Sequence, residues 1–178
     1  MKSVLVLYLS RNGHTARVAR GIAASIDAAG GKAERMDLVE AFREGLDWNS
    51  YDAVAVGAPV RYGTYDKRVF KFVAANKTRL DAMPNSFFNV SVVARNPAKA
   101  TVEGNSYMQK FLRLSDWKPK DLKVFAGKVD YPNWSWHERK IIQLIMKMTD
   151  GPTDPSTVID FTDWNEVAKY GRHLLALP

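Results

Sequence analysis

The stretch VLVLYLSRNGHT, residues 4–15, joins a short apolar strand to a small polar loop, and a helical pattern follows it. The first turn of a helix carries unpaired backbone N–H groups at the positive end of the helix dipole, so a loop placed there can bind an anion. Gly13 lets the backbone turn close to a ligand. The loop matches neither G-x-x-x-x-G-K-S/T nor G-x-G-x-x-G, so it predicts a site for a single phosphate monoester. The alternative is an ordinary helix start capped by Ser10 or Thr15.

Short apolar runs alternate with helical patterns along the rest of the chain. This alternation indicates an α/β fold with a parallel sheet. Polar residues interrupt the second run, as in an edge strand. The expected strands are Val4–Leu9, Lys32–Leu38, Ala53–Gly57, Phe87–Ala94 and Leu122–Ala126, and the expected helices are Thr15–Ala29, Tyr65–Leu80, Ser106–Leu114 and Trp164–Leu177.

The spacing Tyr8-x-Ser10-x-x-Gly13-x-Thr15-x-x-x-Ala19 resembles the FMN phosphate-binding signature of the flavodoxin family. The resemblance implies a doubly wound, five-stranded parallel sheet in the order 2-1-3-4-5, in one FMN-binding domain over 1–178. It also implies that FMN is held by Ser10, Arg11, Asn12, Gly13, His14 and Thr15.

The loops after strands three and four are expected to bracket the flavin, because ligands of such sheets lie outside the carboxyl ends of the strands. Either Tyr62 or Tyr65 can place its aromatic ring against the flavin face. Arg95 is a candidate for the flavin N1 or for an acidic substrate, and a surface ion pair is the alternative. No residue stands out as a catalytic acid or base. The expected flavin contacts are Ala58, Pro59, Val60, Arg61, Tyr62, Gly63, Val93, Ala94, Arg95, Asn105 and Tyr107.

An amphipathic segment lies within residues 130–156. Its basic arc and wide apolar arc are typical of a helix that binds a membrane surface or a partner, although most amphipathic helices cover their own core. The segment resembles the insertion of long-chain flavodoxins, which implies that it splits strand five into Leu122–Lys128 and Thr157–Phe161. Its candidate membrane, quinone or substrate contacts are Trp134, Trp136, Arg139, Lys140, Ile141, Leu144, Ile145 and Met148.

The net charge of +7 is concentrated in one third of the 178 residues. Residues 95–147 contain eleven Lys and Arg against five Asp and Glu, which predicts a basic surface for an anionic partner. No recognised nucleic-acid module accompanies it, so nucleic acid is the weakest candidate. The chain has no cysteine and no histidine spacing that would hold a metal. No run is apolar for long enough to span a membrane, and a cytoplasmic location is expected.

The combination Ala58-x-x-Arg61-Tyr62-Gly63-x-Tyr65, Val93-Ala94-Arg95-x-Pro97, Asn105-Ser106-Tyr107, Tyr131-Pro132 and Leu144-Ile145-Met146-Lys147-Met148 resembles the flavodoxin-like, quinone-dependent protoporphyrinogen IX dehydrogenases. This resemblance implies that FMN oxidises protoporphyrinogen IX in haem synthesis and passes electrons to menaquinone or ubiquinone.

The same resemblance places the protein at an anionic membrane surface, on the cytoplasmic face of the inner membrane. The two propionates of the substrate are expected to bind within residues 95–147. The alternatives are a membrane-docked flavodoxin-type electron carrier and an NAD(P)H quinone reductase. The sequence does not determine whether the chain forms a homo-oligomer.

Overall fold

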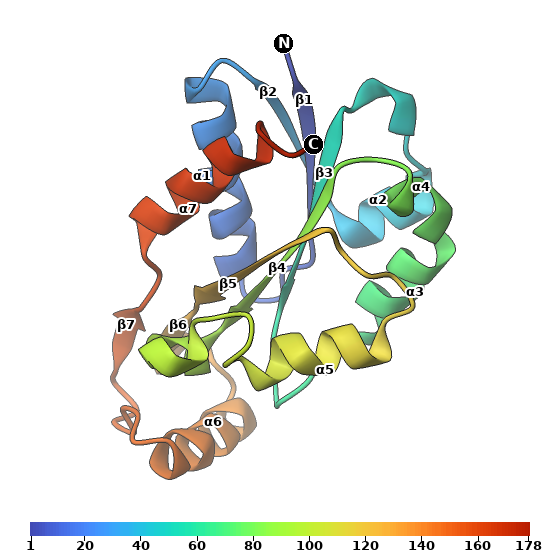
Figure 1. Cartoon of the computed structure of the whole chain (residues 1–178). Coiled ribbons are helices and arrows are strands. Elements are labelled where there is room, and N and C mark those ends of the chain that lie inside the picture. The colour runs from blue at the N-terminus through green and yellow to red at the C-terminus, as the bar shows by residue number, and fades with distance from the viewer.

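The computed structural model describes residues 1–178, and its centre is a five-stranded sheet. Neighbouring strands all pair in parallel, in the order β2-β1-β3-β4-β5, so the predicted doubly wound α/β topology is confirmed. Both chain termini lie at the amino ends of the parallel strands, and the loop that follows β1 lies at their opposite, carboxyl ends (Figure 1). The strands are β1 (Ser3–Tyr8), β2 (Lys32–Asp37), β3 (Ala53–Pro59), β4 (Asn85–Ser91) and β5 (Asp121–Ala126).

Helices cover both faces of the sheet, because side chains alternate between the two faces along each buried strand. Val4 and Val6 of β1 pack toward one helical layer, and Leu5 and Leu7 pack toward the other. Figure 1 shows α1 and α7 on one side of the sheet and α2 to α5 on the other. The helices of the two layers are α1 (His14–Ala28), α2 (Leu38–Glu44), α3 (Lys67–Ala75), α4 (Lys77–Asp81), α5 (Ser106–Leu114) and α7 (Trp164–Leu174).

Most expected elements are present with bounds shifted by a few residues, and three differences from the sequence-based expectation are larger. The expected helix Tyr65–Leu80 is divided into α3 and α4 at Asn76, whose side chain donates to the Phe72 carbonyl at 2.9 Å. The strand expected to run to Ala94 ends at Ser91. A helix at Leu38–Glu44 was not expected; Asp37 caps it by accepting from the Val39 N–H. Short 3-10 turns occupy Trp48–Ser50, Val92–Arg95, Pro97–Lys99 and Tyr131–Asn133.

The insert leaves the sheet after β5 and forms a small unit of its own. It contains β6 (Lys128–Asp130), α6 (Trp136–Met148) and β7 (Val158–Asp160). The expected splitting of strand five is not confirmed, because β7 pairs antiparallel with β6 in a separate two-stranded sheet. Figure 1 shows α6 beyond the edge of the main sheet. A small apolar cluster, Val129, Tyr131 and Met146, joins α6 to this ribbon.

Candidate functional site

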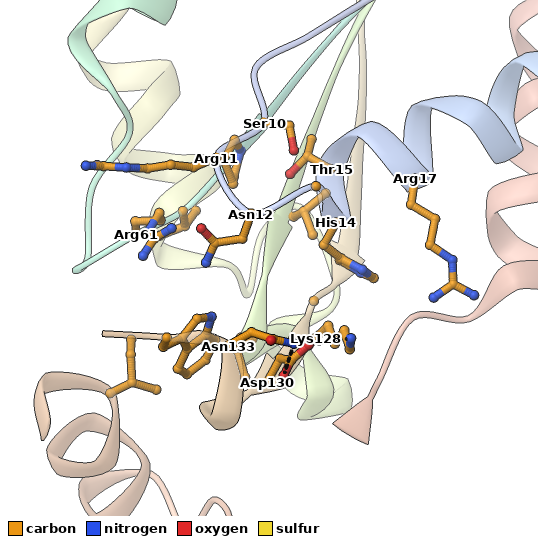
Figure 2. Close-up of a pocket in the computed structure, with 18 residues that line it drawn as sticks. Ser10, Arg11, Asn12, His14, Thr15, Arg17, Arg61, Lys128, Asp130 and Asn133 are labelled. Carbon is orange, nitrogen blue, oxygen red and sulfur yellow. Dashed lines mark hydrogen bonds and ion pairs between the residues drawn. The ribbon is translucent and has the colours of Figure 1, made fainter. Parts of the chain in front are cut away.

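A cavity of about 500 Å³ opens between the loop after β1 and the insert. Cofactor pockets usually enclose ~300–1,000 Å³, so this cavity is of suitable size. Figure 2 shows Ser10, Asn12 and Thr15 on one side and Asp130 and Asn133 on the facing side. Its lining residues come from four segments, within 10–17, 59–61, 90–92 and 127–142.

The loop after β1 presents unpaired donors to this cavity. Gly13 precedes α1 with φ of 83°, and no side chain caps the helix, so the alternative of a cap by Ser10 or Thr15 is not found. The Oγ of Ser10 is buried without a hydrogen-bond partner. An orphaned buried polar group costs ~1–3 kcal/mol, and a ligand oxygen would remove that cost. The free helix N-terminus and this hydroxyl fit a phosphate group.

Cationic side chains predominate around the cavity. Arg11, Arg17, Arg61 and Lys128 line it, against a single acid, Asp130. Lys128 pairs with Asp130 at 2.6 Å, and this hydrogen bond is the main reason that the pKa of Asp130 is lowered. Arg17 pairs with Asp160 at 3.3 Å and Arg61 pairs with Glu138, so Arg11 is the lining cation without a carboxylate partner, and its charge favours an anionic ligand.

His14 connects the loop after β1 to the segment that follows the insert. Its Nε2 lies 2.8 Å from the Thr162 Oγ1, and that hydroxyl donates to the Ala126 carbonyl at 2.8 Å. The imidazole therefore donates through Nε2. Burial lowers the pKa of His14, against the opposing effect of Asp160 at 3.8 Å. His14 is thus a neutral donor that holds the loop in place.

The loop after β3 turns sharply at the edge of the cavity. Arg61 and Thr64 exchange two backbone hydrogen bonds, of 2.9 and 3.0 Å. Tyr62 and Gly63 between them have φ of 50° and 74°, as a type I′ turn requires. Tyr62 is 41% exposed but does not line the cavity, and Tyr65, the other expected aromatic contact, is buried. Pro59, Val60 and Arg61 line the cavity, whereas Ala58 is buried behind them.

The loop after β4 binds the insert and contributes little to the lining of the cavity. The guanidinium of Arg95 donates to the carbonyl of Thr149 at 2.6 Å and to its Oγ1 at 3.1 Å, and Arg95 does not line the cavity. Neither do Val93 and Ala94; the residues of this segment that line it are Val90 and Val92. Arg95 is therefore an anchor for the end of α6.

The other two residues expected near the flavin lie behind the loops. Asn105 is fully buried, caps α5 by accepting from the Met108 N–H at 3.0 Å, and lies 3.2 Å from Asn89. The ring of Tyr107 lies against Gly63 rather than in the cavity. Tyr107 thus lies beside the turn at Tyr62, and Asn105 holds the start of α5.

The insert supplies the facing wall, which sequence reasoning largely missed. Of the expected insert residues, Trp134 lines the cavity. The sequence places this segment directly after strand five, and ligands bind at the carboxyl ends of such strands. This position could have predicted that the segment lines the cavity. Residues that line the cavity and were not expected to do so are Arg17, Val90, Val92, Gly127, Lys128, Asp130, Asn133 and Ile142.

Helix α6 has an inner and an outer face. Met146 is buried, Ile145 and Arg139 are half-buried, and the Nε of Arg139 is enclosed without a partner. Four apolar side chains on the helix are exposed: Trp136 (64%), Ile141 (45%), Leu144 (61%) and Met148 (77%). Lys140 and Lys147 are exposed beside them. The outer face, defined by these six residues, combines apolar and basic character.

The structure contains neither a metal-binding cluster nor a membrane-spanning helix. No group of three or more His, Cys, Asp or Glu side chains has a metal-binding arrangement. None of the helices combines the length and the apolar character needed to cross a bilayer.

Comparison with known proteins places this geometry among flavoproteins. Residues 5–156 match the family model described as Flavodoxin domain. A protein named protoporphyrinogen IX dehydrogenase (quinone) from Escherichia coli strain K12 is 40% identical over 97% of this chain and 94% of its own length. A protein of the same name from Leishmania major is 36% identical over 98% of this chain and 75% of its own length.

Solved structures agree on the fold. Oxidised flavodoxin 1 from Bacillus cereus superposes with a TM-score of 0.51, at 15% identity, over 98% of both chains. Two-electron reduced flavodoxin from Megasphaera elsdenii gives 0.50 at 18% identity, over 68% of this chain and 84% of its own.

Proposed function

Because the chain belongs to the flavodoxin domain family, and within it to the protoporphyrinogen IX dehydrogenases (quinone), we propose that it oxidises protoporphyrinogen IX with bound FMN and passes the electrons to a membrane quinone. The cavity between the phosphate loop and the insert carries this proposal. An ordinary electron carrier needs a flavin edge near its surface, whereas here the insert forms a second wall that faces the loop after β1.

The residues of the cavity fit FMN in particular among flavins. A single phosphate satisfies the orphaned Ser10 Oγ and the uncapped start of α1. No glycine-rich dinucleotide motif is present for a larger cofactor. When bound, the flavin supplies the hydride-accepting chemistry that this chain's side chains lack. The phosphate loop and the turn at Tyr62 then hold and orient it.

The insert has two roles in this proposal. Its inner side, with Trp134 and Ile142, offers an apolar surface to a tetrapyrrole and excludes water from the flavin. Its outer face would dock on an anionic bilayer, where a quinone is reached, because exposed apolar and basic side chains together suit a lipid interface. We treat residues 130–156 as part of one domain, since Arg95 and Arg61 of the main fold both bind the insert.

The test is anaerobic incubation of the FMN-loaded protein with protoporphyrinogen IX and a menaquinone analogue. We expect porphyrin fluorescence to rise only when the acceptor is present. A rate no higher than in the protein-free control would contradict the proposal and favour the carrier. Rapid bleaching of the flavin by NADPH would favour the NAD(P)H quinone reductase. Equilibrium dialysis measures FMN binding separately.

A further inference from the structure

A smaller cavity of about 100 Å³ lies beside the large one and shares Arg11, Pro59 and Arg61 with it. Arg68 and Asp66 complete its charged lining. We refer to this cavity as the arginine alcove, defined by Arg11, Arg61 and Arg68. It is too small for a tetrapyrrole ring but has room for a carboxylate on a short arm.

Two of the three guanidinium groups of the alcove already have carboxylate partners. Arg61 binds Glu138 of α6. Arg68 forms a fork with Asp66, with contacts of 3.0 and 2.7 Å, and this fork lowers the pKa of Asp66 to about 2. Asp66 therefore stays ionised and paired at neutral pH. Arg11 has no ion pair or side-chain hydrogen bond and is exposed, so the alcove retains one unmatched positive charge.

The direction of Arg11 separates it from the phosphate site. In Figure 2 its side chain extends toward the side of Arg61, away from Thr15 and His14. An arginine that served the phosphate would reach toward the uncapped start of α1 instead. A guanidinium binds a carboxylate through two parallel hydrogen bonds, which suits a short carboxylate arm.

We propose that the arginine alcove binds one carboxylate of the substrate through Arg11, beside the flavin pocket. This inference rests on the proposed function, because protoporphyrinogen IX carries two propionate arms. Arg61 and Arg68 line the same cavity, and their own carboxylate partners keep them in place. The substrate is thereby oriented with one arm in the alcove and its ring between the flavin and the insert.

The expected propionate site within residues 95–147 does not have this character. Arg95 is bound to Thr149, and Lys128, which lines the large cavity, is paired with Asp130. Lys140 and Lys147 lie on the outer face of α6. The unmatched cation next to the cavity is thus Arg11, which belongs to the loop after β1.

The test compares protoporphyrin IX, the stable product with the same two propionates, with its dimethyl ester. Both are titrated into FMN-loaded protein in the same detergent, and quenching of tryptophan fluorescence reports binding. We expect the wild type to bind the diacid about tenfold more tightly than the ester, since the ester cannot form the charge-assisted pair with a guanidinium. Arg11→Gln should bind both alike. Arg79→Gln removes the same charge from exposed α4 and should keep the wild-type ratio.

Each outcome decides between the two proposals. A wild-type ratio in Arg11→Gln, or no discrimination by the wild type, overturns the alcove even when porphyrinogen is oxidised. A fall of more than threefold in FMN affinity in Arg11→Gln also overturns it, because Arg11 would then serve the cofactor. If the wild type oxidises no porphyrinogen, the proposed function fails, while the binding ratio still reports on the alcove.

Discussion

Arg61, in the turn after β3, donates a hydrogen bond to the carboxylate of Glu138 in the first turn of α6, 77 residues away. Both side chains are about one-fifth exposed. This ion pair joins the loop that faces the flavin site to the insert that forms its other wall. Arg95 and Thr149 make a second connection at the opposite end of the same helix. The insert is therefore attached to the main fold at both ends of α6.

Glu138→Gln should loosen the first connection without uncapping α6. Glu138 also accepts from the Ser135 N–H at 3.0 Å in a capping box, and glutamine can still accept that bond. Loss of the charge leaves Arg61 half-buried and unpaired, so we expect unfolding to become easier by about 1 kcal/mol and FMN release to accelerate a few-fold. Stopped-flow flavin fluorescence measures the release. Glu138→Ala also removes the capping box, so it should lose more stability and release FMN faster than Glu138→Gln. Equal release rates in the wild type and both variants would contradict the role of this ion pair.

Replacing Gly13 with valine should weaken both folding and FMN binding. Gly13 has φ of 83° and no atom lies within 4 Å of its missing Cβ, so the cost is backbone strain rather than a clash, about 1–2 kcal/mol. Gly30 at the other end of α1 has the same φ and the same open surroundings, and it is the matched control. Both valine variants should lose similar stability in denaturant titrations, but Gly13→Val alone should lose FMN affinity. Equal affinities would mean that the phosphate site lies elsewhere.

The alternation of strands and helices and the glycine loop before α1 were predictable because local patterns determine them, whereas the strand order came from the resemblance to flavodoxins. Buried strands are continuous apolar runs, and a glycine before a helix is visible in the sequence. The two strands of the insert are three residues long, and β7 is exposed throughout, so no apolar run marks their pairing. The partner of Arg95 is partly a backbone carbonyl 54 residues away, which leaves no trace in side-chain patterns. The arginine alcove was not predicted either, because its arginines come from the loop after β1, the turn after β3 and the start of α3.

Stability should depend on the protonation of His14. Burial lowers its pKa below the usual 6.5, so the unfolded chain binds the proton more tightly than the folded one. The stability is complete above about pH 6.5 and is lost as the pH falls from there through the lower folded pKa. His14→Gln still donates to Thr162 but does not titrate. Melting temperatures between pH 5 and 8 should therefore fall less steeply for His14→Gln than for the wild type. Parallel curves would show that other groups cause the acid sensitivity.

Arg95→Ala should release the end of α6 rather than act selectively on the substrate. The variant loses the bonds to the Thr149 carbonyl and hydroxyl, at 2.6 and 3.1 Å. Hydrogen exchange should accelerate in residues 136–149 while β1 to β5 remain protected. The KM values for porphyrinogen and for quinone should rise together. Thr149→Val keeps the carbonyl and should have a smaller effect. A rise confined to the KM for porphyrinogen would instead indicate that Arg95 binds the substrate.

The outer face of α6 gives the last prediction, which concerns the bilayer. Leu144 is 61% exposed on this face, and Leu114 of α5 is 56% exposed elsewhere, so the two leucines form a matched pair. Leu144→Asp should reduce co-sedimentation with vesicles that contain one-third anionic lipid by at least tenfold, because burial of a leucine contributes ~1.5–3 kcal/mol and a carboxylate is also repelled. Leu114→Asp should co-sediment like the wild type. Both variants should melt within about 2 °C of the wild type, since surface substitutions change stability little. If Leu144→Asp bound vesicles as well as the wild type, the outer face of α6 would not be a bilayer-binding surface.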